Sequence, residues 1–153
     1  MPLTPADVAP IESDIESDTE PTGQRVGIVG LHHLRLPVRD VLAARAWLIE
    51  EFGFDPVLIE ETEDKVTGAV VEHPTGLVIG LHADPARCAA LGDFIVIALA
   101  VDDLEEWDEW LTRRSTPHEP ITSGSLGQRI SVPGAGGVIV ELHSPDHPDD
   151  GAA

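Results

Sequence analysis

The sequence predicts an α+β domain built from two tandem modules, each with the element order strand, helix, strand, strand, strand. Two closing segments resemble each other: GLVIGLHADP begins at residue 76 and GVIVELHSPD begins at residue 137. Two opening segments do the same, since LPVRDV begins at residue 36 and LAVDDL at residue 99. The same order of helical and strand-like patterns recurs between each opening and closing segment, so a duplicated βαβββ unit explains both pairs.

The helix of the first module is predicted at residues 41–52. Asp40 stands directly before it, in the position where a side-chain carboxylate caps the first free N–H groups. Gly53 follows it, in the position that favours a left-handed residue. Apolar residues at helical spacing predict the buried stripe of this helix to be Leu42, Ala46, Ile49 and Phe52.

The helix of the second module is predicted to begin after Asp103, with Glu106 completing a pattern that resembles a capping box. Arg113 and Arg114 stand at its C-terminal end, where the helix dipole favours cations. The expected buried stripe is Leu104, Trp107 and Leu111, with Trp107 and Trp110 as core anchors.

Alternating apolar residues predict eight strands, and GAGG at 134–137 reads as a hairpin turn before the last of them. The strands are expected at residues 30–38, 56–61, 65–73, 75–82, 93–101, 118–123, 127–132 and 136–143.

The two ends of the chain differ from its centre in composition. Residues 1–25 are rich in Pro, Ser, Thr, Asp and Glu, and predict a flexible acidic arm. Residues 147–153 predict a flexible tail. Residues 26–146 are expected to form a single domain, with the first module at about 30–90 and the second at about 92–144.

The chain is strongly acidic, with a net charge of −19 from 28 acidic and 9 basic residues. Such a surface repels phosphates, so nucleic acid is excluded as a partner. No apolar run approaches the ~20 residues that cross a bilayer, and a basic-then-apolar signal pattern is absent, so a cytoplasmic protein without a membrane partner is expected. Cys88 stands alone and reads as a structural thiol.

Three segments carry a family resemblance: LHHLRLPVRDVLAARAWLIEEFGF, GAGGVIVELHSP and, in support, IALAVDDL. In these the chain resembles the vicinal oxygen chelate superfamily, which contains glyoxalase I, bleomycin-resistance proteins and ring-cleaving extradiol dioxygenases. The resemblance covers residues 30–145. It implies that the sheets of both modules curl around an eight-stranded cleft, and that two chains pair as a homodimer. It is specific for fold and weak for reaction, because this fold hosts many chemistries.

The resemblance also implies metal ligands on the first and last strands of both modules. The matching positions are His33, Gly80, Val96 and Glu141. Glycine and valine cannot coordinate, so His33 and Glu141 remain as an incomplete pair of metal ligands.

Strand alternation indicates which neighbours share the wall of the cleft. Alternation turns His32, Leu34 and Leu36 towards the helix. The predicted ligand-binding residues on the wall are His33, Arg35, His82, Glu141 and His143.

Each of these five residues also has an ordinary structural alternative. His33 would then be a core histidine bonded to a backbone carbonyl, and Arg35 the ion-pair partner of Glu141. His82 and His143 would be rim residues at strand ends. Glu141 has the weakest alternative, because an unpaired carboxylate between apolar neighbours is costly to bury.

Two functions follow from these residues. The favoured one is the binding of a small organic molecule in the cleft without a complete metal site, and hence without a cofactor. The alternative is a divalent-metal-dependent lyase, isomerase or ring-cleaving dioxygenase that uses His33 and Glu141, with its catalytic residues unassigned. A third ligand would have to be His82 or His143. These lie two residues along their strands from Gly80 and Glu141, or ~7 Å away, whereas a ligand bond is ~2 Å long.

Overall fold

The computed structural model describes residues 26–92 and 95–144. From residue 31 onward the described residues form one compact unit, and residues 26–30 have no regular secondary structure. The predicted arm at 1–25 and the predicted tail at 147–153 lie outside the described residues. In the part that is described, no helix is both long and apolar enough to cross a membrane.

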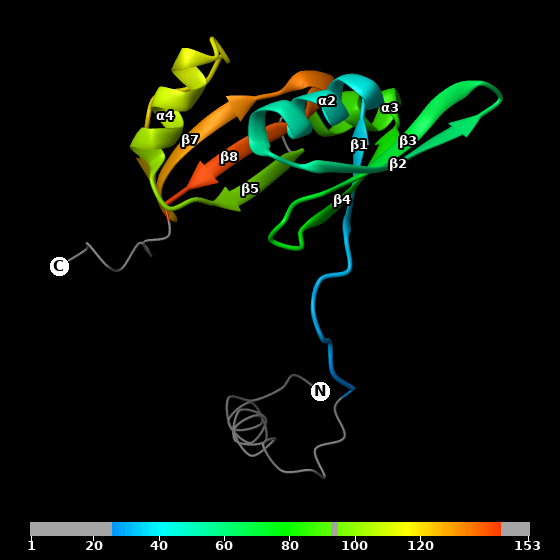
Figure 1. Cartoon of the computed structure of the whole chain (residues 1–153), viewed down its shortest axis with the longest axis horizontal. Helices are drawn as coiled ribbons and strands as arrows, with labels where there is room; N and C mark the ends of the chain where they lie inside the picture. The colour runs from blue at the N-terminus through cyan, green and yellow to red at the C-terminus, as the bar shows by residue number, and fades with distance from the viewer. Residues whose placement is uncertain (1–25, 93–94, 145–153) are drawn as a thin grey trace, which may run out of the picture. The chain divides into compact units, whose positions relative to one another are not determined.

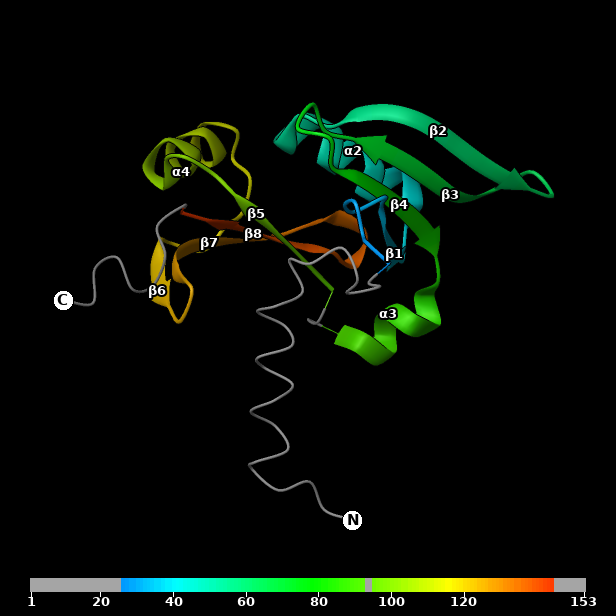
Figure 2. The same ribbon diagram turned by 90° about the horizontal axis from the view of Figure 1, so that it is seen from below.

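The strands form two four-stranded sheets of the same topology (Figures 1 and 2). They are β1 (Leu34–Val38), β2 (Asp55–Thr62), β3 (Lys65–Glu72), β4 (Val78–Ala83), β5 (Val96–Ala100), β6 (Thr122–Gly124), β7 (Gly127–Pro133) and β8 (Ile139–His143). The order is β1-β4-β3-β2 in sheet one and β5-β8-β7-β6 in sheet two. In each sheet the first and last strands of the module pair in parallel and the other pairs are antiparallel. The predicted α+β fold of two tandem βαβββ modules is confirmed.

Helix α2 (Val41–Phe52) covers one face of sheet one. Both of its predicted caps are present: Asp40 accepts a hydrogen bond from the Ala43 N–H at 3.0 Å, and Gly53 has a φ of 73°. The predicted buried stripe is confirmed at Phe52 and was wrong at its other three positions, since Leu42 is exposed and Ala46 and Ile49 are only half-buried. This helix has apolar residues of its own on several sides, so their spacing alone could not identify the buried face. The buried residues are Val41, Ala44, Leu48 and Phe52.

Helix α4 (Leu104–Arg113) packs on sheet two. Asp103 caps it as predicted, accepting hydrogen bonds from the N–H groups of Glu105 and Glu106 at 3.0 and 3.1 Å. Leu104 and Leu111 are buried, which confirms the predicted stripe at those positions.

The two tryptophans of α4 differ in their environment. Trp107 is half-buried and stacks on Phe52, with ring centroids 5.8 Å apart. Trp110 is 37 % exposed, so its prediction as a core anchor was wrong. Its ring instead lies beneath the guanidinium of Arg114, 5.2 Å from the ring centroid.

A third helix, α3 (Pro85–Leu91), was not predicted. Asp84 caps it by accepting a hydrogen bond from the Arg87 N–H at 3.0 Å, and Pro85 begins it. A capping aspartate followed by proline was therefore a readable helix-start signal. Cys88 is buried on this helix, as expected of a structural thiol.

The GAGG segment joins β7 to β8, as the predicted turn requires, and includes the short helix η3 (Ala135–Gly137). This segment also contacts helix α2 and so links the second module to the first. A Cβ on Gly134 would overlap the Trp47 indole of α2, and one on Gly136 would lie 2.8 Å from the Asp40 carbonyl oxygen. The Arg39 N–H donates to the Gly136 carbonyl at 2.7 Å. Helix α2 therefore approaches this turn too closely for larger residues.

A second contact between the modules is the ion pair of Glu51 and Arg114, near the C-terminal ends of α2 and α4. The guanidinium donates to the carboxylate at 2.9 and 3.1 Å, and the Thr116 hydroxyl donates to it at 3.0 Å. The Glu51 side chain is only 11 % exposed. All its bonds come from the second module, so this carboxylate ties the two modules together.

Candidate functional site

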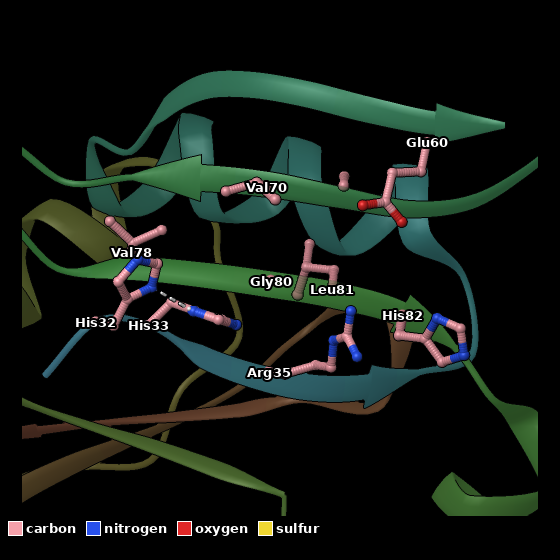
Figure 3. Close-up of a pocket in the computed structure, with 10 residues that line it drawn as sticks. His32, His33, Arg35, Glu60, Val70, Val78, Gly80, Leu81 and His82 are labelled. Atoms are coloured by element: carbon pink, nitrogen blue, oxygen red, sulfur yellow. Dashed lines mark hydrogen bonds between the residues drawn. The ribbon is translucent and has the colours of Figure 1, made fainter.

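The face of sheet one that turns away from α2 carries a pocket of about 240 Å³ (Figure 3). Val70 and Val78 form its apolar floor beside Gly80, and Ala69 and Leu81, whose side chains are buried in the core, also line it. Five polar side chains surround this floor, namely His32, His33, Arg35, Glu60 and His82. We call this cavity the sheet-one pocket.

Strand register explains why Arg35 lies over the floor. Arg35 on β1 is the direct partner of Gly80 on β4, which in turn is paired with Val70 on β3. Directly paired residues share one face of a sheet. Their neighbours Ile79 and Leu81 alternate towards α2 and are buried. The predicted face for Arg35 is confirmed by this register.

A second set of directly paired residues lies across the same face of sheet one. His82 on β4 pairs with Gly68 on β3, and Gly68 pairs with Glu60 on β2. A Cβ on Gly68 would lie 2.9 Å from Glu60 Oε2. The glycine therefore leaves the space in which the Glu60 carboxylate lies. Figure 3 shows Glu60 and Arg35 extending over the floor from β2 and β1.

Gly80 is different, because packing does not require a glycine there. A Cβ added at this position would have as its nearest atoms the Leu34 carbonyl oxygen at 3.6 Å and His33 Cδ2 at 3.9 Å, which are ordinary contact distances. This position, which the superfamily resemblance implies as a metal-ligand position, is thus open, and it widens the pocket beside Arg35.

His32 and His33 precede β1 and form a pair. Their Nδ1 atoms lie 2.8 Å apart, so one ring donates to the other, and the rings meet edge to face. Both line the sheet-one pocket. The prediction that His32 turns towards the helix was wrong, because strand alternation does not extend to residues that lie before the strand.

Glu141 and His143 lie on β8 of sheet two and do not line the sheet-one pocket. His143 Nε2 lies 3.1 Å from Glu141 Oε1, and the two side chains are 15 % and 23 % exposed. Glu141 is paired with Ser131 on β7 and Ala98 on β5. The carboxylate thus finds a partner on its own strand.

The structure therefore brings three of the five predicted ligand-binding residues, His33, Arg35 and His82, into one pocket. It places the other two together on the second sheet. Among residues 26–92 and 95–144, Arg35 has no ion pair, so the alternative of an Arg35–Glu141 pair does not occur. Sequence reasoning missed Glu60, although the alternation of its strand was a usable signal.

The family is shown by a match of residues 30–142 to the model of the Glyoxalase/Bleomycin resistance protein/Dioxygenase superfamily. The chain belongs to this superfamily. None of the curated proteins is a significant match to it.

Solved structures of superfamily type share the fold at low sequence identity. TnmS3, an antibiotic-binding protein from Streptomyces sp. CB03234, is 17 % identical with a TM-score of 0.64, over 80 % of this chain and 100 % of its own. A possible glyoxalase from Bacillus cereus is 20 % identical with a TM-score of 0.61, over 76 % and 99 %. A bleomycin-binding protein complexed with bleomycin is 16 % identical with a TM-score of 0.60, over 77 % and 100 %. At these identities the likeness concerns the fold.

The superfamily resemblance raises the question of whether the residues present suit a metal ion. His33 lines the sheet-one pocket, whereas Glu141 is bonded to His143 on the other sheet. Across the described ranges, no group of three or more His, Cys, Asp or Glu side chains is arranged to hold an ion. Protein metal sites with catalytic roles usually have three such ligands. The donor set of the described residues does not fit a metal ion.

Proposed function

We propose that this protein binds a small organic acid in the sheet-one pocket. The observation that carries the proposal is the Arg35 guanidinium, which reaches over the apolar floor and has no ion pair among the described residues. Arginine keeps its charge and presents a planar fork of donors that matches a carboxylate or phosphonate. A ligand anion would supply the missing partner.

Among the described residues Arg39, Arg45 and Arg129 also have no ion pair, and Arg35 differs from them in lining the sheet-one pocket. The chain has 28 acidic residues, so carboxylate partners are abundant. Arg87, Arg113 and Arg114 each have one within 3.7, 3.9 and 2.9 Å. Arg35 shares its pocket with three imidazoles and with the Glu60 carboxylate, with which it forms no ion pair. Charge-assisted bonds to an anion are about twice as strong as neutral ones.

Glu60 and the imidazoles indicate what else the acid should carry. The Glu60 carboxylate accepts hydrogen bonds, so it favours a ligand with a hydroxyl or amino group opposite its acid group. The volume of about 240 Å³ lies below the roughly 300–1,000 Å³ of pockets for drug-sized ligands. A small hydroxy or amino acid suits both features.

Calorimetric titration with a panel of small acids tests the proposal. The panel should pair each aliphatic or aromatic hydroxy acid with its methyl ester. We expect an acid to bind at least tenfold more tightly than its ester, a difference of about 1.4 kcal/mol. Arg35→Gln should remove this preference, whereas Arg87→Gln, on exposed α3, should keep it. Equal binding of acid and ester, or an unchanged preference in Arg35→Gln, would sink the proposal.

We also propose that two chains form a homodimer through the free edge of sheet one. Strand β2 is an edge strand, and its Val57, Leu58 and Ile59 are 51, 45 and 41 % exposed. Exposed apolar edge strands need cover. Light scattering should give twice the 16.3 kDa mass of one chain, and Leu58→Lys should shift it towards the monomer. A monomer mass at micromolar concentration would contradict the dimer.

A further inference from the structure

A second hollow lies where the C-terminal end of α2 and the end of β5 meet helix α4. It consists of two adjoining cavities of about 730 and 380 Å³. They share Phe52, Thr75, Ala100, Val101 and Trp107 as lining residues. We call the two cavities together the intermodule cleft. It has no lining residue in common with the sheet-one pocket.

The inner part of the intermodule cleft is apolar. Phe54, Leu77, Leu99 and Leu142 line it. His73 is its one imidazole, packed edge-on to Phe54 with ring centroids 5.2 Å apart. A flat apolar body would be removed from water in this part of the cleft.

The mouth of the intermodule cleft carries carboxylates. Glu50, Asp102 and Glu106 line it and are exposed. None of these three has an ion pair in the described part of the chain, whereas Glu51 is neutralised by Arg114. Arg113 also lines the mouth, but its guanidinium lies 3.9 Å from Glu109. The mouth therefore presents three carboxylates that have no ion pair among the described residues.

The wall between mouth and interior is aromatic. Trp107 stacks on Phe52, and Trp110 lines the mouth with its ring partly in water. Trp110 already holds a cation, because the Arg114 guanidinium lies 5.2 Å from its ring centroid. Electron-rich ring faces attract cations. The same wall thus provides apolar contact and aromatic ring faces that attract positive charge, although Arg114 covers one face of Trp110.

We propose that the intermodule cleft is a second binding site, and that it takes an organic cation with a flat apolar body. The ring system enters the apolar interior beside Trp107. The positive charge stays at the mouth near Glu50, Asp102 and Glu106. The acid-binding pocket on sheet one and this cleft therefore select ligands of opposite charge, and neither assignment depends on the other.

Three flat tricyclic probes of similar size test the charge preference. They are N-methylacridinium as the cation, acridine at mildly alkaline pH as the neutral form, and anthracene-9-carboxylate as the anion. Equilibrium dialysis at low salt, where screening is weak, should show the cation bound at least tenfold more tightly than acridine, and the anion most weakly. An anion that binds as tightly as the cation would overturn the proposal.

Matched charge variants locate the site. The triple variant Glu50→Gln, Asp102→Asn, Glu106→Gln should weaken cation binding at least tenfold. The control triple variant removes the same number of negative charges from the exposed β2–β3 hairpin. It is Glu61→Gln, Glu63→Gln, Asp64→Asn. It should change the affinity for the cation less than threefold. Equal losses in both variants would show that only overall charge attracts the probe, and the proposal would fail.

A steric variant separates the cleft from any other surface. Ala100 is exposed at the end of β5 and lines both cavities. Ala100→Leu should reduce cation binding at least tenfold while leaving every charge in place, and Arg35→Gln should leave it unchanged. Cation binding that survives Ala100→Leu unchanged would refute the cleft as the binding site.

Discussion

Arg35 on β1 and Gly80 on β4 are direct partners in the parallel ladder of sheet one, so the guanidinium lies beside a position that has no side chain. This pair leaves open space in the pocket directly beside the guanidinium. A carboxylate at residue 80 would fill the space and neutralise the charge.

Gly80→Glu should therefore form an ion pair with Arg35 and reduce acid binding at least tenfold. Gly80→Ala is the matched control, because its Cβ would meet only ordinary contacts of 3.6 Å and more. We expect Gly80→Ala to change affinity less than threefold. Calorimetric titration with the tightest acid of the panel measures both. Unchanged acid binding by Gly80→Glu would show that Arg35 does not hold the ligand.

Glu141→Ala should leave both acid affinity and metal content unchanged. Glu141 is bonded to His143 on sheet two and does not line the sheet-one pocket. Two protein ligands hold a divalent ion weakly, so elemental analysis of protein purified without chelators should find well under one ion per chain. A stoichiometric transition metal that is lost on Glu141→Ala would restore the metal-dependent alternative.

Gly136→Ala should lower the free energy of unfolding by about 2–4 kcal/mol, as the sum of overpacking and a strained φ. The new Cβ would lie 2.8 Å from the Asp40 carbonyl oxygen and 2.9 Å from the Ala44 Cβ, at a φ of 74°.

Gly53→Ala separates the two effects. It has a similar φ of 73° but nothing within 4 Å of the new Cβ, so it should cost only about 1–2 kcal/mol. Urea unfolding compares the two variants. Equal losses would show that α2 does not press on the 134–137 turn.

His118 should make stability depend on pH. Its side chain is 12 % exposed, and its ring nitrogens lie 2.7 Å from the Thr116 carbonyl oxygen and 2.8 Å from Asp108 Oδ1. The hydrogen bond to Thr116, with a further contribution from Asp108, raises the pKa of His118 above its ordinary 6.5. Folding thus favours the protonated ring. The stabilisation is complete below pH 6.5, the ordinary value, and is lost as the pH rises through the higher folded-state pKa.

His118→Gln should remove this part of the pH dependence, whereas Glu119→Gln, at the exposed neighbouring residue, should keep it. Urea midpoints from slightly acid to alkaline pH provide the measurement. A parallel dependence in the wild type and in His118→Gln would contradict the assignment.

The fold could be predicted closely because its signals are local. Asp40, Gly53 and Asp103 are caps that act within one helical turn, and their predictions were confirmed. The face of α2 could not be predicted, because apolar residues surround the helix and only contact with sheet one selects the buried side. The exposure of Trp110 likewise depends on how α4 is set against the other module.

The candidate site was predictable within one sheet and not between sheets. Alternation placed Arg35 and His82 on the pocket face, because β1 and β4 are regular strands in register. It failed for His32, which precedes β1. Alternation also wrongly placed Glu141 and Arg35 on one wall. It carries no information on the relative position of the two sheets, which depends on contacts such as that of Trp47 with Gly134.

The most direct test of the proposed function is the arginine side-chain Nε–Hε signal of Arg35 in ¹⁵N-correlated NMR spectra. Its assignment comes from the peak that is lost in Arg35→Gln. During titration with the small hydroxy acids of the panel, we expect a saturable shift of the Arg35 signal for at least one acid, with the Arg87 and Arg113 signals unmoved. An Arg35 signal that stays in place with every acid, or shifts no more than those of the other arginines, would show that Arg35 does not bind the ligand.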